Sequence, residues 1–298
     1  MFFILSIKYE SVDKMKIVTF ALNDSIVSGV LENDEVRVCA EGRSAVQDAI
    51  ASGEIATWGS GDGQRVPVDQ VQLLSPIPDP RGGIYCIGKN YYAHADEFHG
   101  SGFDSSSKEA VPPHPVVFTK PPASVVGPGV TVLASLDHTD TVDYEGELGV
   151  VIGKDAFKVS KDKAMDYVFG YVVINDVTSR ELQRRHGQWI IGKGLDTFCP
   201  IGPWLVTADE AGDPSKMELV TEINGEVRQK ASVSDLIFDV PTLIETMSAT
   251  MTLRAGDIIA TGTAAGVGIG FNPPRYLKPG DKMRVSITGL GALENPVG

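Results

Sequence analysis

Cysteine is scarce in this chain: three of the 298 residues, Cys39, Cys86 and Cys199, are cysteines. An odd number at scattered positions builds neither a disulfide framework nor the paired spacing of a zinc site. We therefore expect reduced, buried thiols in an intracellular protein. A cytoplasmic location is the expectation, with the mitochondrial matrix as the alternative.

Long apolar runs are also missing, and no stretch reaches the roughly 20 residues that a transmembrane helix needs. The apolar start, residues 1–7, is short and has no basic residue ahead of it, which argues against a signal peptide. Basic residues are outnumbered, with 26 Lys and Arg against 39 Asp and Glu and a net charge of −13. This balance argues against nucleic acid or an anionic membrane as the main partner.

Strand-like patterns dominate what is present. Short apolar runs alternate with glycine and proline, and the helical candidates do not alternate regularly with them, which argues against a TIM barrel or a Rossmann fold. We predict an α+β, β-rich fold. The helical candidates are residues 44–52, 161–167, 178–186 and 241–249.

The pattern divides the chain into four parts. Expected are an N-terminal extension (1–14), a small β-rich N-terminal α+β domain (15–75), a Pro- and Gly-rich connector (76–83) and one long catalytic domain (84–298). Residues 262–270 are glycine-rich, but without a convincing following helix they are a weak dinucleotide fingerprint. Residues 96–115 look like a mobile loop, and beside a site such a loop would act as a lid.

Three carboxylates stand out. Glu145 and Glu147 are two residues apart, next to the apolar run 148–152, so in a strand they would point to the same face. Asp176 ends a second apolar strand, residues 171–176. Like charges so close need a partner, and oxygen ligands favour Mg²⁺, Mn²⁺ or Ca²⁺ over zinc. The plainer alternative is a set of exposed carboxylates at strand ends.

Two further groupings could carry chemistry. If a helix follows the second strand, Asp176, Arg180 and Gln183 lie on one of its faces and could hold an anionic substrate beside a metal. The alternative is a surface salt bridge between Asp176 and Arg180. His94 and Glu97, spaced i and i+3, could form a general-base dyad. By spacing alone, His94 is more simply a surface histidine.

Lys120 and Lys193 each follow an apolar run and precede a Pro or Gly, a position from which a lysine can reach a pocket and stabilise an oxyanion. Thr263, in the glycine-rich segment, could offer its hydroxyl to an anion. The alternatives are solvated lysines and an ordinary tight turn.

In combination, these segments resemble the fumarylacetoacetate hydrolase (FAH) family. The similar segments are residues 88–91 with His94 and Glu97, then 115–120, 143–148, 175–180 with Gln183, 192–200 and 261–268. The likeness covers roughly residues 84–298, and residues 183–193 look most like the oxaloacetate-tautomerase and diketo-acid-hydrolase branch. The chain departs from the family pattern in a longer segment between Glu97 and Lys120 and in Gly-Lys-Gly around Lys193.

The resemblance implies a fold, a dimer and a set of roles. The fold would be a roll of mixed β-sheets with a small N-terminal domain, in a homodimer. The implied metal ligands are Glu145, Glu147 and Asp176, for Mg²⁺ or Mn²⁺, with Ca²⁺ as a substitute in crystals. The implied catalytic residues are His94, Glu97, Lys193 and Gln183, and the implied substrate-binding residues are Lys120, Arg180 and Thr263.

The reaction implied first is C–C bond hydrolysis of a small anionic 2-oxo acid of the acylpyruvate or diketo-acid type. Decarboxylation of oxaloacetate and keto–enol tautomerisation are alternatives at the same site, since all three proceed through one enolate. Two other classes remain open: a non-catalytic protein that binds a metal–oxoacid complex, and a structural protein with a surface calcium site.

Overall fold

The structure is a computed structural model that describes residues 14–100, 102 and 110–298. The predicted extension at 1–14 lies outside these residues except for Lys14, and the predicted lid loop is described only in part. The α+β, sheet-rich fold class is confirmed. In the described part of the chain, no helix is long and apolar enough to span a membrane.

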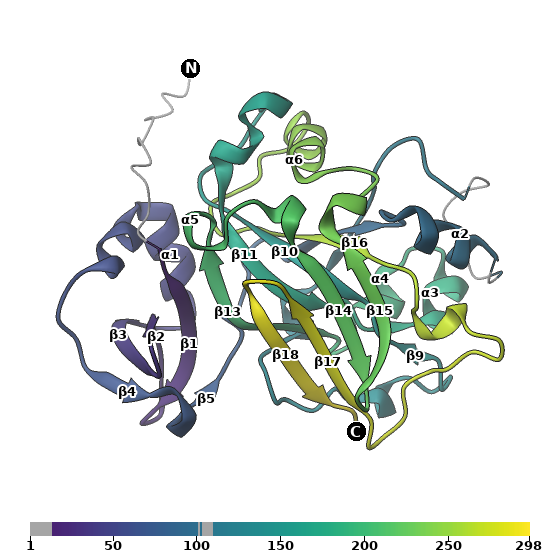
Figure 1. Cartoon of the computed structure of the whole chain (residues 1–298), viewed down its shortest axis with the longest axis horizontal. Helices are drawn as coiled ribbons and strands as arrows, with labels where there is room; N and C mark the ends of the chain where they lie inside the picture. Colours follow the sequence, from purple (N-terminus) through teal and green to yellow (C-terminus); the bar gives the residue numbers. More distant parts are fainter. Residues whose placement is uncertain (1–13, 101, 103–109) are drawn as a thin grey trace.

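The N-terminal unit forms one side of the molecule (Figure 1). Its elements are β1 (Lys16–Leu22), β2 (Ser25–Glu32), β3 (Glu35–Glu41), α1 (Ala45–Ser52), β4 (Arg65–Pro67) and β5 (Gln72–Leu73). Asn33, with φ of 58°, makes the turn between β2 and β3, a conformation that Asn tolerates better than most residues. Gly53 caps α1 in the left-handed conformation, so the helix predicted at 44–52 is confirmed.

This unit continues into the main sheet, because β1 pairs with β13. The sheet runs β4-β3-β2-β1-β13-β11-β10-β16-β6-β7. Its remaining strands are β6 (Ile84–Gly88), β7 (Val116–Lys120), β10 (Gly146–Ile152), β11 (Val168–Asn175), β13 (Cys199–Thr207) and β16 (Ile258–Thr263), and β8 (Val125–Val126) pairs with β13. A four-stranded sheet of β15 (Glu226–Ser232), β14 (Glu218–Ile223), β17 (Lys282–Ile287) and β18 (Gly291–Pro296) packs against it.

The central strand β10 is buried on both faces. Leu148 and Val150 contribute to one hydrophobic core, together with α6 (Val240–Ser248) and the four-stranded sheet. Val151 contributes to a second core, which the N-terminal unit shares. Because side chains alternate along a strand, Glu145 and Glu147 face the same side as Val151. The strand therefore carries its two carboxylates at the edge of a packed core.

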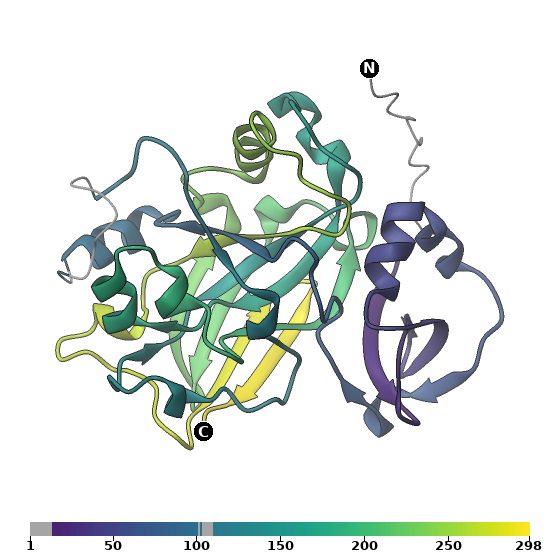
Figure 2. The ribbon, with the colours of Figure 1, turned by 180° about the vertical axis from the view of Figure 1, so that it is seen from behind.

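The remaining helices and short pieces lie around the sheets. α2 (Tyr92–Gly100), α3 (Arg180–His186) and α4 (Ile190–Lys193) gather on the side away from the N-terminal unit, as both ribbon views show (Figures 1 and 2). The others are α5 (Ala208–Ala211), a short pair of β9 (Val142–Asp143) with β12 (Thr178–Ser179), and 3-10 helices at Glu54–Gly59, Val68–Gln70, Pro122–Ser124, Ala134–Leu136, Lys161–Tyr167, Pro214–Lys216, Val233–Asp235 and Gly268–Gly270.

Two of the four helix predictions need correction. Residues 161–167 form a 3-10 helix, and the helix predicted over 178–186 begins only at Arg180. Thr178 and Ser179 pair instead with Asp143 and Val142. This strand pairing is a tertiary contact that the helical pattern does not reveal. The helix predicted at 241–249 is confirmed as α6.

Leu243 tests the core under α6. Its side chain is fully buried, so Leu243→Ala should lower the free energy of unfolding by about 2–5 kcal/mol. Thr246→Ala in the same helix is the control, because Thr246 is exposed and its loss should cost about 0.5 kcal/mol or less. Urea unfolding measures both; equal midpoints would contradict the assigned packing.

Candidate active site and metal centre

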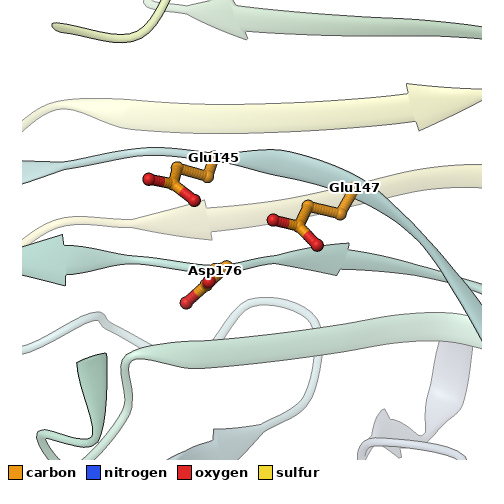
Figure 3. Close-up of side chains that lie close together, drawn as sticks. All are labelled: Glu145, Glu147 and Asp176. Atoms are coloured by element: carbon orange, nitrogen blue, oxygen red, sulfur yellow. The ribbon is translucent and has the colours of Figure 1, made fainter. Parts of the chain in front are cut away.

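The three predicted carboxylates meet. Glu145 directly precedes β10, Glu147 lies within it, and Asp176 follows the antiparallel neighbour β11. The main-chain N–H of Asp176 donates to the carbonyl of Glu145 at 2.8 Å, which fixes the two strand ends together. Ligand oxygens of all three side chains lie within 4.8 Å of one another, and all three residues are buried. Figure 3 shows the three side chains lying close together. The alternatives of exposed carboxylates and of a surface calcium site are wrong.

Two lysines contact this trio. Lys193, at the end of α4, places Nζ 2.8 Å from Glu145 Oε2 and 2.8 Å from Asp176 Oδ2. Lys120, at the end of β7, donates to Asp176 Oδ1 at 2.6 Å and to the carbonyl of Val177 at 2.9 Å. Both side chains are buried, so the alternative of solvated lysines is wrong.

The charges in the trio are unevenly compensated. Burial alone would raise the pKa of Glu145, but the charges of Lys193 and Arg180 lower it to about 2. Burial, and then the carboxylates of Asp176 and Glu145, raise the pKa of Glu147 well above its usual range. The carboxylate of Glu147 accepts the main-chain N–H of Gly262 at 2.8 Å. The three side chains offer only oxygen atoms as ligands, and the charge of Glu147 is the least balanced by neighbouring cations. Such a set of ligands fits a hard divalent cation.

Arg180 is buried and does not pair with Asp176, so both sequence interpretations of this pair need correction. Asp176 precedes the helix and contacts the lysines instead. Arg180 Nε donates to Asp143 Oδ2 at 2.9 Å, and Nη1 donates to Glu145 Oε1 at 2.6 Å and to Gln183 Oε1 at 3.3 Å. Among the described residues, its Nη2 is buried without a hydrogen-bond partner. An unsatisfied cationic donor is costly to bury, which suits a site that takes up an anion.

The predicted dyad lies on α2. His94 Nδ1 is 3.4 Å from Glu97 Oε2, and the ring of His94 stacks against Phe98 with centroids 6.0 Å apart. His94 is only 4% exposed, so it is not the surface histidine that spacing alone suggests; His99 is exposed. Both oxygens of Glu97 accept the main-chain N–H of Gly266, at 3.1 and 3.2 Å.

A small pocket joins these groups. Its free volume is about 10 Å³, enough for about one water molecule. It is lined by Ile87, Gly88, Lys89, His94, Phe98, Glu145, Arg180, Gln183, Trp189, Lys193 and Thr263. Six of the ten predicted site residues line it, namely His94, Glu145, Arg180, Gln183, Lys193 and Thr263, and Glu97 contacts His94.

Two predicted substrate contacts look different in the structure. Lys120 does not line the pocket and sits behind Asp176. Thr263 lines it, but its hydroxyl donates to the carbonyl of Gly146 at 2.9 Å and accepts from Gln229 at 2.7 Å. The hydroxyl proton is therefore committed to the main chain and is not offered to an anion.

Sequence reasoning assigned no role to Lys89, Trp189 or Asp143. Lys89 lines the pocket. Its backbone φ is 57°, a conformation that the surrounding sequence does not predict for a lysine. Trp189 packs edge-on against Phe98 and Phe118, with centroids 6.2 and 5.1 Å away. Asp143 lies two residues before Glu145, and only its buried contacts distinguish it from a surface acid.

Comparison with known proteins agrees with this arrangement. A match to the family "Fumarylacetoacetate (FAA) hydrolase C-terminal" spans residues 83–298, and a match to "Rv2993c-like, N-terminal" spans residues 15–76. The chain is 50% identical over 231 residues to oxaloacetate tautomerase YisK of Bacillus subtilis (strain 168), covering 78% of this chain and 74% of that protein.

Two solved structures are similar over nearly the whole chain. Fumarylacetoacetate hydrolase (EaFAH) from Exiguobacterium antarcticum is 39% identical, with a TM-score of 0.80 over 95% of this chain and 99% of that one. The 2-hydroxyhepta-2,4-diene-1,7-dioate isomerase from Mycobacterium marinum is 36% identical, with a TM-score of 0.74 over 95% and 98%.

Lys120 tests the ionic network behind the trio. Lys120→Met leaves a fully buried carboxylate with one cation fewer, which should lower the free energy of unfolding by about 3–5 kcal/mol in chelator-treated protein. Lys163→Met is the control, because Lys163 is exposed. If urea unfolding gave the two variants the same midpoint, Lys120 would not stabilise Asp176.

Proposed function

Because the chain belongs to the fumarylacetoacetate hydrolase family, we propose that it is a divalent-metal-dependent enzyme that tautomerises a small 2-oxo dicarboxylic acid of the oxaloacetate type between its keto and enol forms. The observation that carries this proposal is a small pocket in which buried cationic groups converge beside three buried carboxylates. The sequence put C–C hydrolysis first; the 50% identity to an oxaloacetate tautomerase supports placing tautomerisation ahead of it.

Glu145, Glu147 and Asp176 would hold the ion, Mg²⁺ or Mn²⁺ by the chemistry of their oxygens. When bound, the ion would act as a Lewis acid that polarises the 2-oxo group of the substrate. The residues around it have separate tasks. Arg180 Nη2, Gln183 and Lys193 would bind the anionic oxygens of the substrate, since all three residues line the pocket.

His94 would move the proton at the carbon between the two carbonyl groups. It lines the pocket, and imidazole readily takes and returns a proton near neutral pH. Glu97 would hold the Nδ1 side of the ring, leaving the other nitrogen for the substrate. Phe98 and Trp189 would exclude water, which favours return of the proton to the substrate over hydrolysis.

Hydrolysis of an acylpyruvate is the second candidate. It is favoured by the same His94–Glu97 pair, because a histidine oriented by a carboxylate can also activate water. Oxaloacetate decarboxylation would need neither water nor a base. The homodimer implied by the family resemblance remains a proposal as well, to be tested by light scattering.

The metal proposal predicts an activity that depends on the ion. We expect chelator-treated protein to lose tautomerisation of oxaloacetate, followed by enol absorbance, and to regain it with Mg²⁺ or Mn²⁺. Glu147→Gln should lose both turnover and Mn²⁺ binding in calorimetry. Glu245→Gln, on α6, is the control and should retain both. Full activity after complete metal removal would refute the proposal.

His94 separates the reactions. His94→Ala should slow tautomerisation by about 10²–10⁴-fold, the usual contribution of a general acid–base group. The same variant should retain Mn²⁺ binding, since His94 is not part of the trio. Comparing oxaloacetate with acylpyruvates, with product identification, ranks the two reactions. An unchanged tautomerisation rate would remove His94 from the mechanism.

A further inference from the structure

Asp143 is a fully buried carboxylate with four N–H donors around it. Its Oδ1 accepts the main-chain N–H groups of Tyr144 at 2.9 Å and Gly268 at 2.6 Å. Its Oδ2 accepts the N–H of Ile269 at 3.0 Å and Nε of Arg180 at 2.9 Å. This one side chain therefore connects the first residue of α3 to residues 266–270, which we call the docking turn.

The docking turn holds a second carboxylate, that of Glu97. The N–H of Gly266 donates to both oxygens of Glu97, two residues before the N–H that binds Asp143. A Cβ at Gly270 would overlap the carboxylate of Glu97, and a Cβ at Gly268 would lie 2.6 Å from Asp143 Oδ1. Glycine at these two positions allows both carboxylates to approach the turn.

The connection joins two functional groups of the pocket. At one end, Asp143 and Glu145 fix the guanidinium of Arg180 and leave its Nη2 buried without a partner. At the other end, Glu97 contacts His94. Tyr144 supports the link, because its hydroxyl donates to the carbonyl of Gly266 at 2.9 Å.

We propose that Asp143 is a positioning residue that couples the anion-binding Arg180 to the His94–Glu97 dyad through the docking turn. The proposal rests on the proposed function for the roles of Arg180 and His94, and on geometry alone for the coupling. No hydrogen bond joins Asp143 to Glu97 within the described part of the chain, and the main chain of the turn links them instead. A second route runs from Arg180 across the ring of Phe98, 5.7 Å away, to His94, and only the first route involves the docking turn.

Asp143→Asn is the direct test, because each carboxylate oxygen accepts two N–H donors. Whichever way the amide is oriented, its NH₂ group faces two donors and two hydrogen bonds are lost. We expect Asp143→Asn and Glu97→Gln to be non-additive in kcat/KM, with the double variant differing from the product of the single effects by about threefold or more.

The matched control is Asp257→Asn. Asp257 is also a buried carboxylate that accepts a main-chain N–H, from Arg254 at 2.8 Å. It directly precedes β16, whose other end carries Thr263 in the pocket. In the double variant, the fold-changes in kcat/KM caused by Asp257→Asn and by Glu97→Gln should multiply. Multiplicative effects of Asp143→Asn and Glu97→Gln would overturn the proposal.

Amide hydrogen exchange gives a readout without turnover. In Asp143→Asn, exchange should become faster in α2 and the docking turn while β10 stays protected, and Asp257→Asn should leave α2 unchanged. If Asp143→Asn does not fold, Gly268→Ala crowds the same carboxylate with its charge intact, together with the main-chain carbonyl of Arg275, and should also speed exchange in α2. Unchanged exchange of α2 would refute the coupling.

A wild-type protein inactive on every 2-oxo acid would refute the proposed function and leave the exchange result to decide the coupling.

Discussion

The site depends on placing four carboxyl groups and three cationic side chains in one buried cluster. Asp143, Glu145, Glu147 and Asp176 face Lys120, Arg180 and Lys193, and none of the seven is more than slightly exposed. Charges removed from water persist only when partners surround them. The carboxyl group in excess is Glu147, and burial together with its acidic neighbours raises its pKa. A bound divalent cation would supply the positive partner that Glu147 lacks.

The sheet supplies the rigidity that this cluster requires. The two carboxylates of β10 and the one after β11 come from neighbouring strands whose apolar residues lie in two separate cores. Such strands leave little freedom to the side chains at their ends. The cations come from α3, α4 and the end of β7, so the cluster also holds the two short helices against the sheet.

The sequence predicted the parts of the site that depend on local pattern. Spacing along a strand placed Glu145 beside Glu147, and spacing along a helix placed His94 beside Glu97. It could not predict the partners of Arg180, because they come from a strand pair between residues far apart in the chain. For the same reason it placed Lys120 in the pocket, although a lysine at a strand end reaches whichever carboxylate the fold brings near. The sequence assigned no role to Asp143, because that role is revealed by the burial of the side chain and not by its residue type.

The division between sheet and short helices has a consequence for how such proteins diversify. The three clustered carboxylates lie on or beside the deeply packed strands, whereas His94, Phe98, Gln183 and Trp189 lie on or beside the peripheral helices. Substitutions in those helices can therefore reshape the pocket, or admit water to it, while the cluster of carboxylates stays intact. On the proposed function, changes confined to these outer segments would alter which acid is bound and whether water reaches it.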